Sequence, residues 1–127
     1  MSGTDYAEFL RNLIVLHEKS NAMGHNHGKH RVVKGDCRQT IPQFFLQNPN
    51  EYVALAFFDV NSYEPTLKSF EEVWARLVPG GIVAFWQLTR SSIPAESRVY
   101  AEKILSSYSH TVHRTATYPG LCYLVKT

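Results

Sequence analysis

The stretch Val53-Ala54-Leu55-Ala56-Phe57-Phe58 decides the fold class, because it is a continuous apolar run that ends in polar Asp59. Unbroken apolarity over this length predicts a central parallel strand that is buried on both faces. A second apolar run, residues 82–86, follows a helical pattern over residues 64–77. A strand, a helix and a strand in that order predict a parallel pair with the helix packed on the sheet.

Further helices and strands are predicted on both sides of this strand–helix–strand unit in the sequence. On the N-terminal side the spacing predicts helices over residues 4–19, with one buried apolar stripe, and 40–47, and a short strand over 31–34. On the C-terminal side it predicts a helix over 95–106, with Val99, Ile104 and Leu105 facing inward, and an antiparallel hairpin of strands 111–117 and 121–126. The pattern therefore predicts an α/β fold with a mostly parallel sheet of about five strands.

Length and composition exclude several classes of protein. A chain of 127 residues with 44% hydrophobic residues is sufficient for one globular domain, which we expect to span residues 1–127. Basic residues exceed acidic ones by 13 − 11 = +2, too small and scattered an excess to predict nucleic-acid binding. No apolar run approaches the roughly 18–20 residues of a membrane span. The polar N-terminus does not resemble a signal peptide. The chain has two cysteines that lie far apart in the sequence, so we expect reduced thiols and a cytoplasmic location.

Two motifs carry a resemblance to a known family. The runs FDVNSYEPT (residues 58–66) and RLVPGGIV (residues 76–83), preceded by Gly35-Asp36, resemble the C-terminal half of class I S-adenosylmethionine-dependent methyltransferases. The group with the greatest similarity is the macrocin O-methyltransferase-like sugar methyltransferases. The resemblance extends from about Tyr6 to Thr127 and implies a truncated Rossmann-like core.

The resemblance also implies that a cofactor-binding half is missing. Members of the family begin with two strands and a glycine-rich loop that holds the cofactor, whereas Gly24, Gly28 and Gly35 lack the Gly-x-Gly spacing. Gly80-Gly81 precedes a strand instead of following one, so it is a turn. Asp36 matches a position that reaches the cofactor's adenine in many relatives. We therefore expect no cofactor; S-adenosylmethionine and Mg²⁺ belong only to the alternative function given below.

The residues that carry the family's chemistry are altered. Asp59 matches the first carboxylate after the fourth strand, a metal ligand, but Asn61 stands where the family has its base, and an amide cannot take a proton from a sugar hydroxyl. Trp86 and Gln87 replace the acidic ligands after the fifth strand, and Mg²⁺ prefers several oxygen ligands. Asn61, Tyr63, Trp86 and Gln87 are candidate ligand-pocket residues.

Each candidate also has a structural interpretation. Asp59 and Asn61 suit a turn at a strand end, and Trp86 suits packing. His25, His27 and His30 form the one clustered metal-type pattern, in a loop where solvated histidines are the other interpretation.

The absence of the cofactor-binding half leads us to expect a partner chain. Without its usual neighbours the apolar strand 53–58 exposes an unpaired edge, which favours association. Three solutions are open. The remaining strands pair directly, or two copies form a homodimer by edge pairing or by exchange of the first helix or the third strand, or a separate chain supplies the missing half. We expect the homodimer, and a non-catalytic, methyltransferase-derived binding or oligomeric module. The alternative is an S-adenosylmethionine-dependent O-methyltransferase, or a subunit of one, completed by another chain.

Overall fold

A computed structural model describes residues 5–20, 28–90, 92 and 94–127. Residues Met1–Gly35 and Asp36–Thr127 form two compact units, here termed unit 1 and unit 2. The prediction of a single domain over the whole chain stays a prediction.

The described residues of unit 1 contain one helix and, over residues 28–34, a segment that is neither helix nor strand. Helix α1 (Tyr6–Lys19) begins after Asp5, whose carboxylate accepts a hydrogen bond from the Ala7 backbone N–H at 3.2 Å. Lys34 forms an ion pair with Asp5 at 3.1 Å. The prediction of a strand over residues 31–34 is wrong, because this segment pairs with no other strand among the described residues and so has no ladder to join.

The apolar stripe of α1 also differs from the prediction. Tyr6, Phe9, Leu13 and Leu16 are 37–70% exposed, and Ala7 is the one buried residue of the helix. A stripe is buried only where a second element covers it, and α1 is the one helix described in unit 1.

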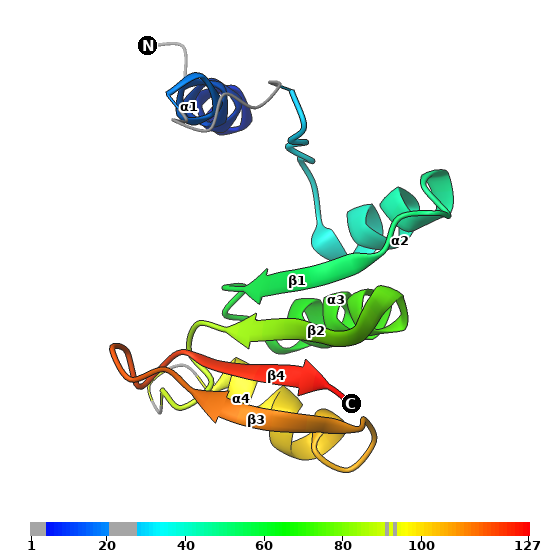
Figure 1. Cartoon of the computed structure of the whole chain (residues 1–127), viewed down its shortest axis with the longest axis vertical. Helices are drawn as coiled ribbons and strands as arrows, with labels where there is room; N and C mark the ends of the chain where they lie inside the picture. Colours follow the sequence, from blue (N-terminus) through cyan, green and yellow to red (C-terminus); the bar gives the residue numbers. More distant parts are fainter. Residues whose placement is uncertain (1–4, 21–27, 91, 93) are drawn as a thin grey trace. The chain divides into compact units, whose positions relative to one another are not determined.

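Unit 2 is an α/β body whose helices cover one face of a sheet (Figure 1). Its elements in chain order are α2 (Cys37–Gln47), β1 (Val53–Phe58), α3 (Tyr63–Arg76), β2 (Leu77–Phe85), α4 (Ala95–Val99), the π-helix η1 (Tyr100–Ile104), β3 (His110–Arg114) and β4 (Cys122–Lys126). The predicted α/β, Rossmann-like architecture is confirmed.

The sheet has the strand order β1-β2-β4-β3. β1 pairs parallel with β2, whereas β4 runs antiparallel to both β2 and β3, so the C-terminal hairpin is confirmed. The described sheet has four strands, against about five predicted, because residues 31–34 do not join it. One of its three strand pairs is parallel, so the sheet is mixed and less parallel than predicted.

β1 is an edge strand, and the prediction that both its faces are buried is wrong. Phe58 is buried, but Leu55 and Phe57 on the other face are 65% and 57% exposed. The register puts Ala56 and Phe58 beside Val83 and Phe85, on the face that α3 covers. The run is apolar on both faces, but the helices of unit 2 cover only one of them.

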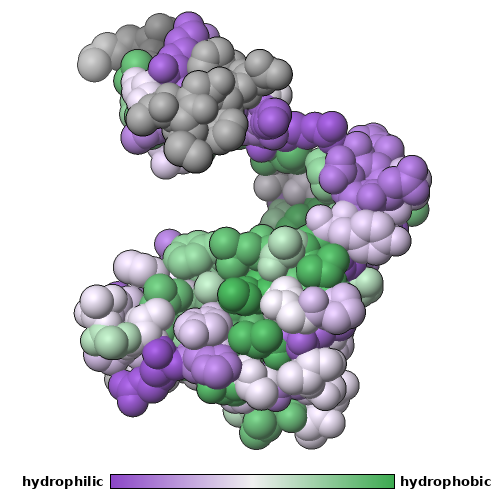
Figure 2. All heavy atoms as spheres, in the orientation of Figure 1, coloured by the Kyte–Doolittle hydropathy of each residue, from purple (hydrophilic) through white to green (hydrophobic). Residues whose placement is uncertain are grey.

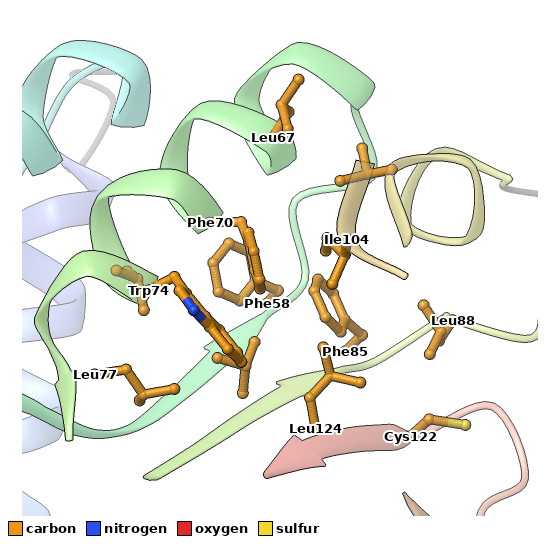
Figure 3. Close-up of a cluster of buried hydrophobic side chains, with 13 residues drawn as sticks. Phe58, Leu67, Phe70, Trp74, Leu77, Phe85, Leu88, Ile104, Cys122 and Leu124 are labelled. Carbon is orange, nitrogen blue, oxygen red and sulfur yellow. The ribbon is translucent and has the colours of Figure 1, made fainter. Parts of the chain in front are cut away.

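The core of unit 2 lies between the sheet and the helices α3, α4 and η1 (Figure 3). Phe70 is fully buried, and its ring lies 5.2 Å from that of Trp74 and 6.2 Å from that of Phe85. At the end of α3 the Lys126 ammonium donates hydrogen bonds to the carbonyls of Trp74 and Leu77, at 3.0 and 2.8 Å. The Trp74 carbonyl also accepts the Leu77 backbone N–H, so Lys126 adds a second donor at the C-terminal end of α3.

The starts of α2 and β2 and the exposure of Leu105 differ from the sequence prediction. α2 begins at Cys37, earlier than predicted, because Asp36 caps it. β2 begins at Leu77: the register shifts from Leu77 to Ile82 while β1 advances by two residues, so the Pro79-Gly80-Gly81 turn forms an irregularity within the strand. Leu105 is 58% exposed instead of buried, because the π-helical bond from its N–H to the Tyr100 carbonyl places Val99 and Ile104 on the inner side.

Candidate functional site at the carboxyl ends of β1 and β2

The residues that follow β1 and β2 meet at one edge of the sheet. Phe58 and Phe85 are register partners, and the Trp86 N–H donates a hydrogen bond to the Phe58 carbonyl at 3.0 Å. The segments that begin with Asp59 and Trp86 therefore leave parallel strands side by side, at the sheet edge where α/β proteins bind ligands. The geometry brings Asp59, Asn61, Trp86 and Gln87 to this edge and makes it the candidate site.

On the β1 side the chain turns sharply into α3. Asp59 and Asn61 are exposed, and Asn61 has a φ of +57°, a left-handed conformation that asparagine tolerates better than most residues. The Tyr63 hydroxyl donates a hydrogen bond to the Glu102 carboxylate at 2.8 Å, and the Arg98 guanidinium lies 5.0 Å from the Tyr63 ring centroid. The bond to Glu102 raises the pKa of Tyr63, so this hydroxyl stays protonated and engaged.

On the β2 side an aromatic group occupies the strand end. The Trp86 ring stacks on Tyr118, with centroids 4.5 Å apart and planes inclined by 23°, and lies 6.0 Å from the Phe57 ring. Trp86 is only partly buried, so the row Phe57–Trp86–Tyr118 presents aromatic surface beside the candidate site.

Next to the end of β2 lies a buried carboxylate that the sequence prediction missed. Glu96, on α4, is 1% exposed, and its Oε2 accepts a hydrogen bond from the Gln87 backbone N–H at 2.7 Å. Its Oε1 and the Gln87 Oε1 are buried without a hydrogen-bond partner. Burial raises the pKa of Glu96, the bond from Gln87 opposes that rise, and the charge of Asp59 adds to it. A single glutamate in a helical pattern normally indicates a solvated face, so spacing alone gave no signal of this role.

Asp36 has a structural role at the start of α2. Its Oδ1 accepts hydrogen bonds from the Arg38 backbone N–H at 2.9 Å and from Arg38 Nε at 3.0 Å. Its Oδ2 accepts bonds from Nε and from the terminal guanidinium nitrogen of the same residue. These interactions lower the pKa of Asp36. Asp36 is therefore an N-cap with both carboxylate oxygens occupied.

The histidine cluster is only partly within the described chain. His25 and His27 lie outside the described residues. His30 Nδ1 lies 2.9 Å from Glu18 Oε1, and the other oxygen of Glu18 accepts a bond from the Gly28 N–H at 2.8 Å. Over residues 5–20, 28–90, 92 and 94–127, no group of three His, Cys, Asp or Glu side chains is arranged to hold a metal ion.

Comparisons with known proteins identify the family and the fold. Residues 4–85 match a family described as a methyltransferase domain. The chain belongs to this methyltransferase-domain family. No curated protein sequence gave a match. None of the described helices of the methyltransferase-domain chain is long and apolar enough to cross a bilayer.

The solved structures similar to the methyltransferase-domain chain include two of CalS11. The apo structure of CalS11, a TDP-rhamnose 3′-O-methyltransferase of calicheamicin biosynthesis, is 31% identical with a TM-score of 0.81, over 94% of this chain and 51% of that one. A second CalS11 structure is 31% identical with a TM-score of 0.82, over 98% and 48%. The O-methyltransferase NovP shares the fold at 15% identity and a TM-score of 0.61, over 91% and 44%. The chain thus spans about half the length of these structures.

The donor set at the candidate site of the methyltransferase-domain chain does not fit the metal that the resemblance implies. Mg²⁺ binds near-octahedral sets of oxygen ligands with carboxylates among them. Asp59 is exposed, but the Glu96 carboxylate is sealed beneath the Gln87 backbone, and Trp86 brings no oxygen. One accessible carboxylate and the Asn61 amide are too few strong donors for a dedicated magnesium site.

Asp36, the position that the resemblance assigns to the cofactor's adenine, does not fit that role either. Asp36 would have to accept hydrogen bonds from adenine, but Arg38 and the start of α2 use both of its oxygens. A ligand would have to displace this ion pair to reach the carboxylate.

Proposed function

We propose that this member of the methyltransferase-domain family is a non-catalytic module that binds a partner or ligand at the carboxyl ends of β1 and β2. The observation that carries the proposal is the replacement of acidic chemistry by aromatic surface at the end of β2. Trp86 lies between Phe57 and Tyr118, with ring centroids 6.0 and 4.5 Å away. Phe57 is exposed and the other two rings are half-buried, and an aromatic row of this kind suits contact with a flat or apolar group.

The groups around the row support binding over catalysis. Proton transfer from a hydroxyl requires a base within hydrogen-bond reach whose pKa suits neutral pH. Asn61 cannot accept a proton near neutral pH. Burial raises the pKa of Glu96, but this side chain is 1% exposed and no acceptor substrate could reach it.

The free thiols support a reducing location for this module. Cys37 and Cys122 are both unpaired, and Cys122 is buried, where burial raises the pKa of its thiol and keeps it protonated. We place the module in the cytoplasm on this ground.

A second candidate is an S-adenosylmethionine-dependent O-methyltransferase completed by another chain. It is favoured by the 31% identity with CalS11 combined with coverage of only 51% of that enzyme. In this alternative a second polypeptide supplies the half of the fold to which this chain has no counterpart, and Asp59 contributes to the site.

A methyl-transfer assay separates the two candidates. The chain is incubated with labelled S-adenosylmethionine, Mg²⁺ and a TDP-rhamnose acceptor, alone and with the half of CalS11 that the chain does not cover. The binding module predicts no transfer in either mixture. Transfer by the mixture that Asp59→Asn abolishes would support the second candidate, and transfer by the chain alone would overturn the first.

A further inference from the structure

We infer that Glu96 keeps its proton in the folded protein at pH values where an exposed glutamate has lost it, and that this proton fastens the loop after β2 to α4. The proton lies on Oε1 of Glu96 and is donated to Oε1 of Gln87, while Oε2 of Glu96 accepts the Gln87 backbone N–H. The pair forms a pH-sensitive latch beside the candidate site. The latch rests on the proposed function only in what it regulates, because both residues belong to unit 2 and no ligand takes part in it.

The first observation is a buried carboxylate whose second oxygen has no partner. Glu96 is 1% exposed, and in the part of the chain that the structure describes its Oε1 makes no hydrogen bond. None of the ion pairs found over residues 5–20, 28–90, 92 and 94–127 involves Glu96. Arg98, on the same helix, bonds Glu102 at 3.2 Å instead. An ionised carboxylate buried without a cation costs several kcal/mol, so a group in this position takes up a proton.

The second observation is a matching deficit on Gln87. Its Oε1 is also buried and also lacks a hydrogen-bond partner among the described residues. An ionised carboxylate and an amide oxygen both only accept hydrogen bonds, so neither can satisfy the other. A carboxylic acid supplies the missing donor. One proton on Glu96 therefore removes both deficits, whereas the anion leaves two buried acceptors unpaired, at about 1–3 kcal/mol each.

The charges around Glu96 do not favour its ionised form. Burial raises the pKa of Glu96, the Gln87 N–H opposes that rise, and the negative charge of Asp59, after β1, adds to it. The other titratable groups of the neighbouring segments are exposed or bonded elsewhere. They are Tyr63, Glu64 and Lys68 on α3, Arg90 in the loop after β2, Arg98 on α4, and Tyr100, Glu102 and Lys103 on η1.

The latch acts on the binding row through the chain itself. Gln87 directly follows Trp86, whose ring stacks on Tyr118 with centroids 4.5 Å apart. Phe57, the third ring of the row, lies on the sheet face that the helices leave open, which Figure 2 shows as a hydrophobic surface turned to the viewer. Loss of the proton leaves an unpaired charge under the loop, so the loop must shift for Glu96 to reach water. Trp86 moves with it.

The direction of the switch follows from linkage. The pKa of Glu96 is raised in the folded state, so the closed latch is favoured at low pH and is lost as pH rises through the folded-state pKa. Glu96→Gln offers the same two hydrogen bonds from a side chain that does not titrate, an amide oxygen that accepts and an amide N–H that donates. This variant therefore holds the latch closed at every pH.

Infrared difference spectra between the wild type and Glu96→Gln test the proton on the full chain from pH 4 to 8. The carboxylic-acid C=O band of one group should persist at pH 6, where an ordinary glutamate keeps its proton in only about 3% of molecules. Its midpoint should lie at least about one pH unit above the ordinary value of 4.5. Glu102→Gln is the matched control, because the bonds from Tyr63 and Arg98 lower the pKa of Glu102 and its band should be gone above about pH 5.

Carbon-13 NMR of the wild type, labelled at the glutamate carboxyl carbons, measures the same midpoint without a substitution. One carboxyl that titrates above about pH 5.5 supports the latch. If every glutamate titrates at or below the ordinary value of 4.5, the proton is not held and the inference is overturned.

Tryptophan fluorescence tests whether the proton moves the loop. Wild-type emission should change between pH 5 and 8 with the midpoint of the infrared band, and the change should be absent in both Glu96→Gln and Trp86→Phe. A raised midpoint with no change in emission would overturn the latch, because the proton would then leave the loop in place. Both measurements omit any ligand, so a failure of the proposed binding function leaves their outcome unaltered.

Discussion

The Glu96 carboxylate accepts a hydrogen bond from the Gln87 backbone N–H at 2.7 Å, with both residues buried. This bond links the loop after β2 to the first turn of α4. The bond satisfies a buried backbone donor, which would otherwise cost about 1–3 kcal/mol. The second carboxylate oxygen has no hydrogen-bond partner, and burial raises the pKa of Glu96.

Glu96→Ala should destabilise the protein by about 1–3 kcal/mol, because it leaves the Gln87 N–H buried without an acceptor. Glu96→Gln retains an acceptor oxygen and is the matched control. Urea unfolding of both variants at pH 5 measures the difference. Equal stability of Glu96→Ala and the wild type would show that the bond contributes nothing.

The stability difference between the wild type and Glu96→Gln should depend on pH. The pKa of Glu96 is raised in the folded state above its ordinary value of 4.5, so the folded state holds the proton more tightly than the unfolded state. The wild type should therefore lose stability relative to Glu96→Gln as pH rises from 4 to 8. Urea midpoints at four pH values measure this trend, and a trend of the opposite sign would mean that the buried carboxylate is stabilised as an anion.

Asp36→Ala should lower the melting temperature by a few degrees, because it removes the N-cap of α2 and the ion pair with Arg38. Asp36→Ser keeps a capping oxygen and should recover part of the loss. The pKa of Asp36 is lowered in the folded state, so its contribution should be present at neutral pH and disappear as pH falls below about 4. Thermal melts at pH 7 and pH 3 measure both effects; an unchanged melt at pH 7 would mean that another group caps the helix.

Phe70→Ala should destabilise unit 2 by about 3–5 kcal/mol, because Phe70 is fully buried against aromatic neighbours. Leu46→Ala, at a side chain that is 81% exposed, should change the free energy of unfolding by less than about 0.5 kcal/mol. Chemical denaturation gives both values. A loss below about 1 kcal/mol for Phe70→Ala would mean that this core is loosely packed.

Introducing two carboxylates at the candidate site should raise the affinity for magnesium above that of the wild type. Asn61→Asp and Trp86→Asp together with Asp59 would provide three carboxylates at the ends of β1 and β2, and aspartate tolerates the φ of +57° at position 61. At 10 mM Mg²⁺ the double variant should gain about 1 kcal/mol of stability through binding. Thermal shift with and without Mg²⁺ measures the gain, and an equal shift in the wild type would show that its own donors suffice.

The sequence predicted whether a segment is a helix or a strand better than it predicted which faces of that element are buried. The run at Val53–Phe58 is a strand as predicted, but apolarity reports which surfaces need cover and not whether this chain covers them. The sequence therefore did not indicate that Leu55 and Phe57 are exposed. The same limit applies to the α1 stripe.

The candidate site shows where sequence reasoning ends. Residues that follow predicted strands can be identified from the sequence, and Asp59, Trp86 and Gln87 are candidates on that ground. The sequence does not reveal Glu96, because nine residues separate the end of β2 from the start of α4 and only the fold brings the Glu96 carboxylate to the Gln87 N–H. Asp36 was interpreted through the resemblance, although an aspartate directly before a helix indicates an N-cap.

Calorimetric titration of the purified chain with S-adenosylmethionine, with and without Mg²⁺, tests the central claim that this methyltransferase-domain chain does not hold the methyl donor by itself. We predict no binding heat up to millimolar ligand in either buffer, for the wild type and for Asp36→Ala alike. Micromolar, one-to-one binding by the wild type that Asp36→Ala abolishes would contradict the account.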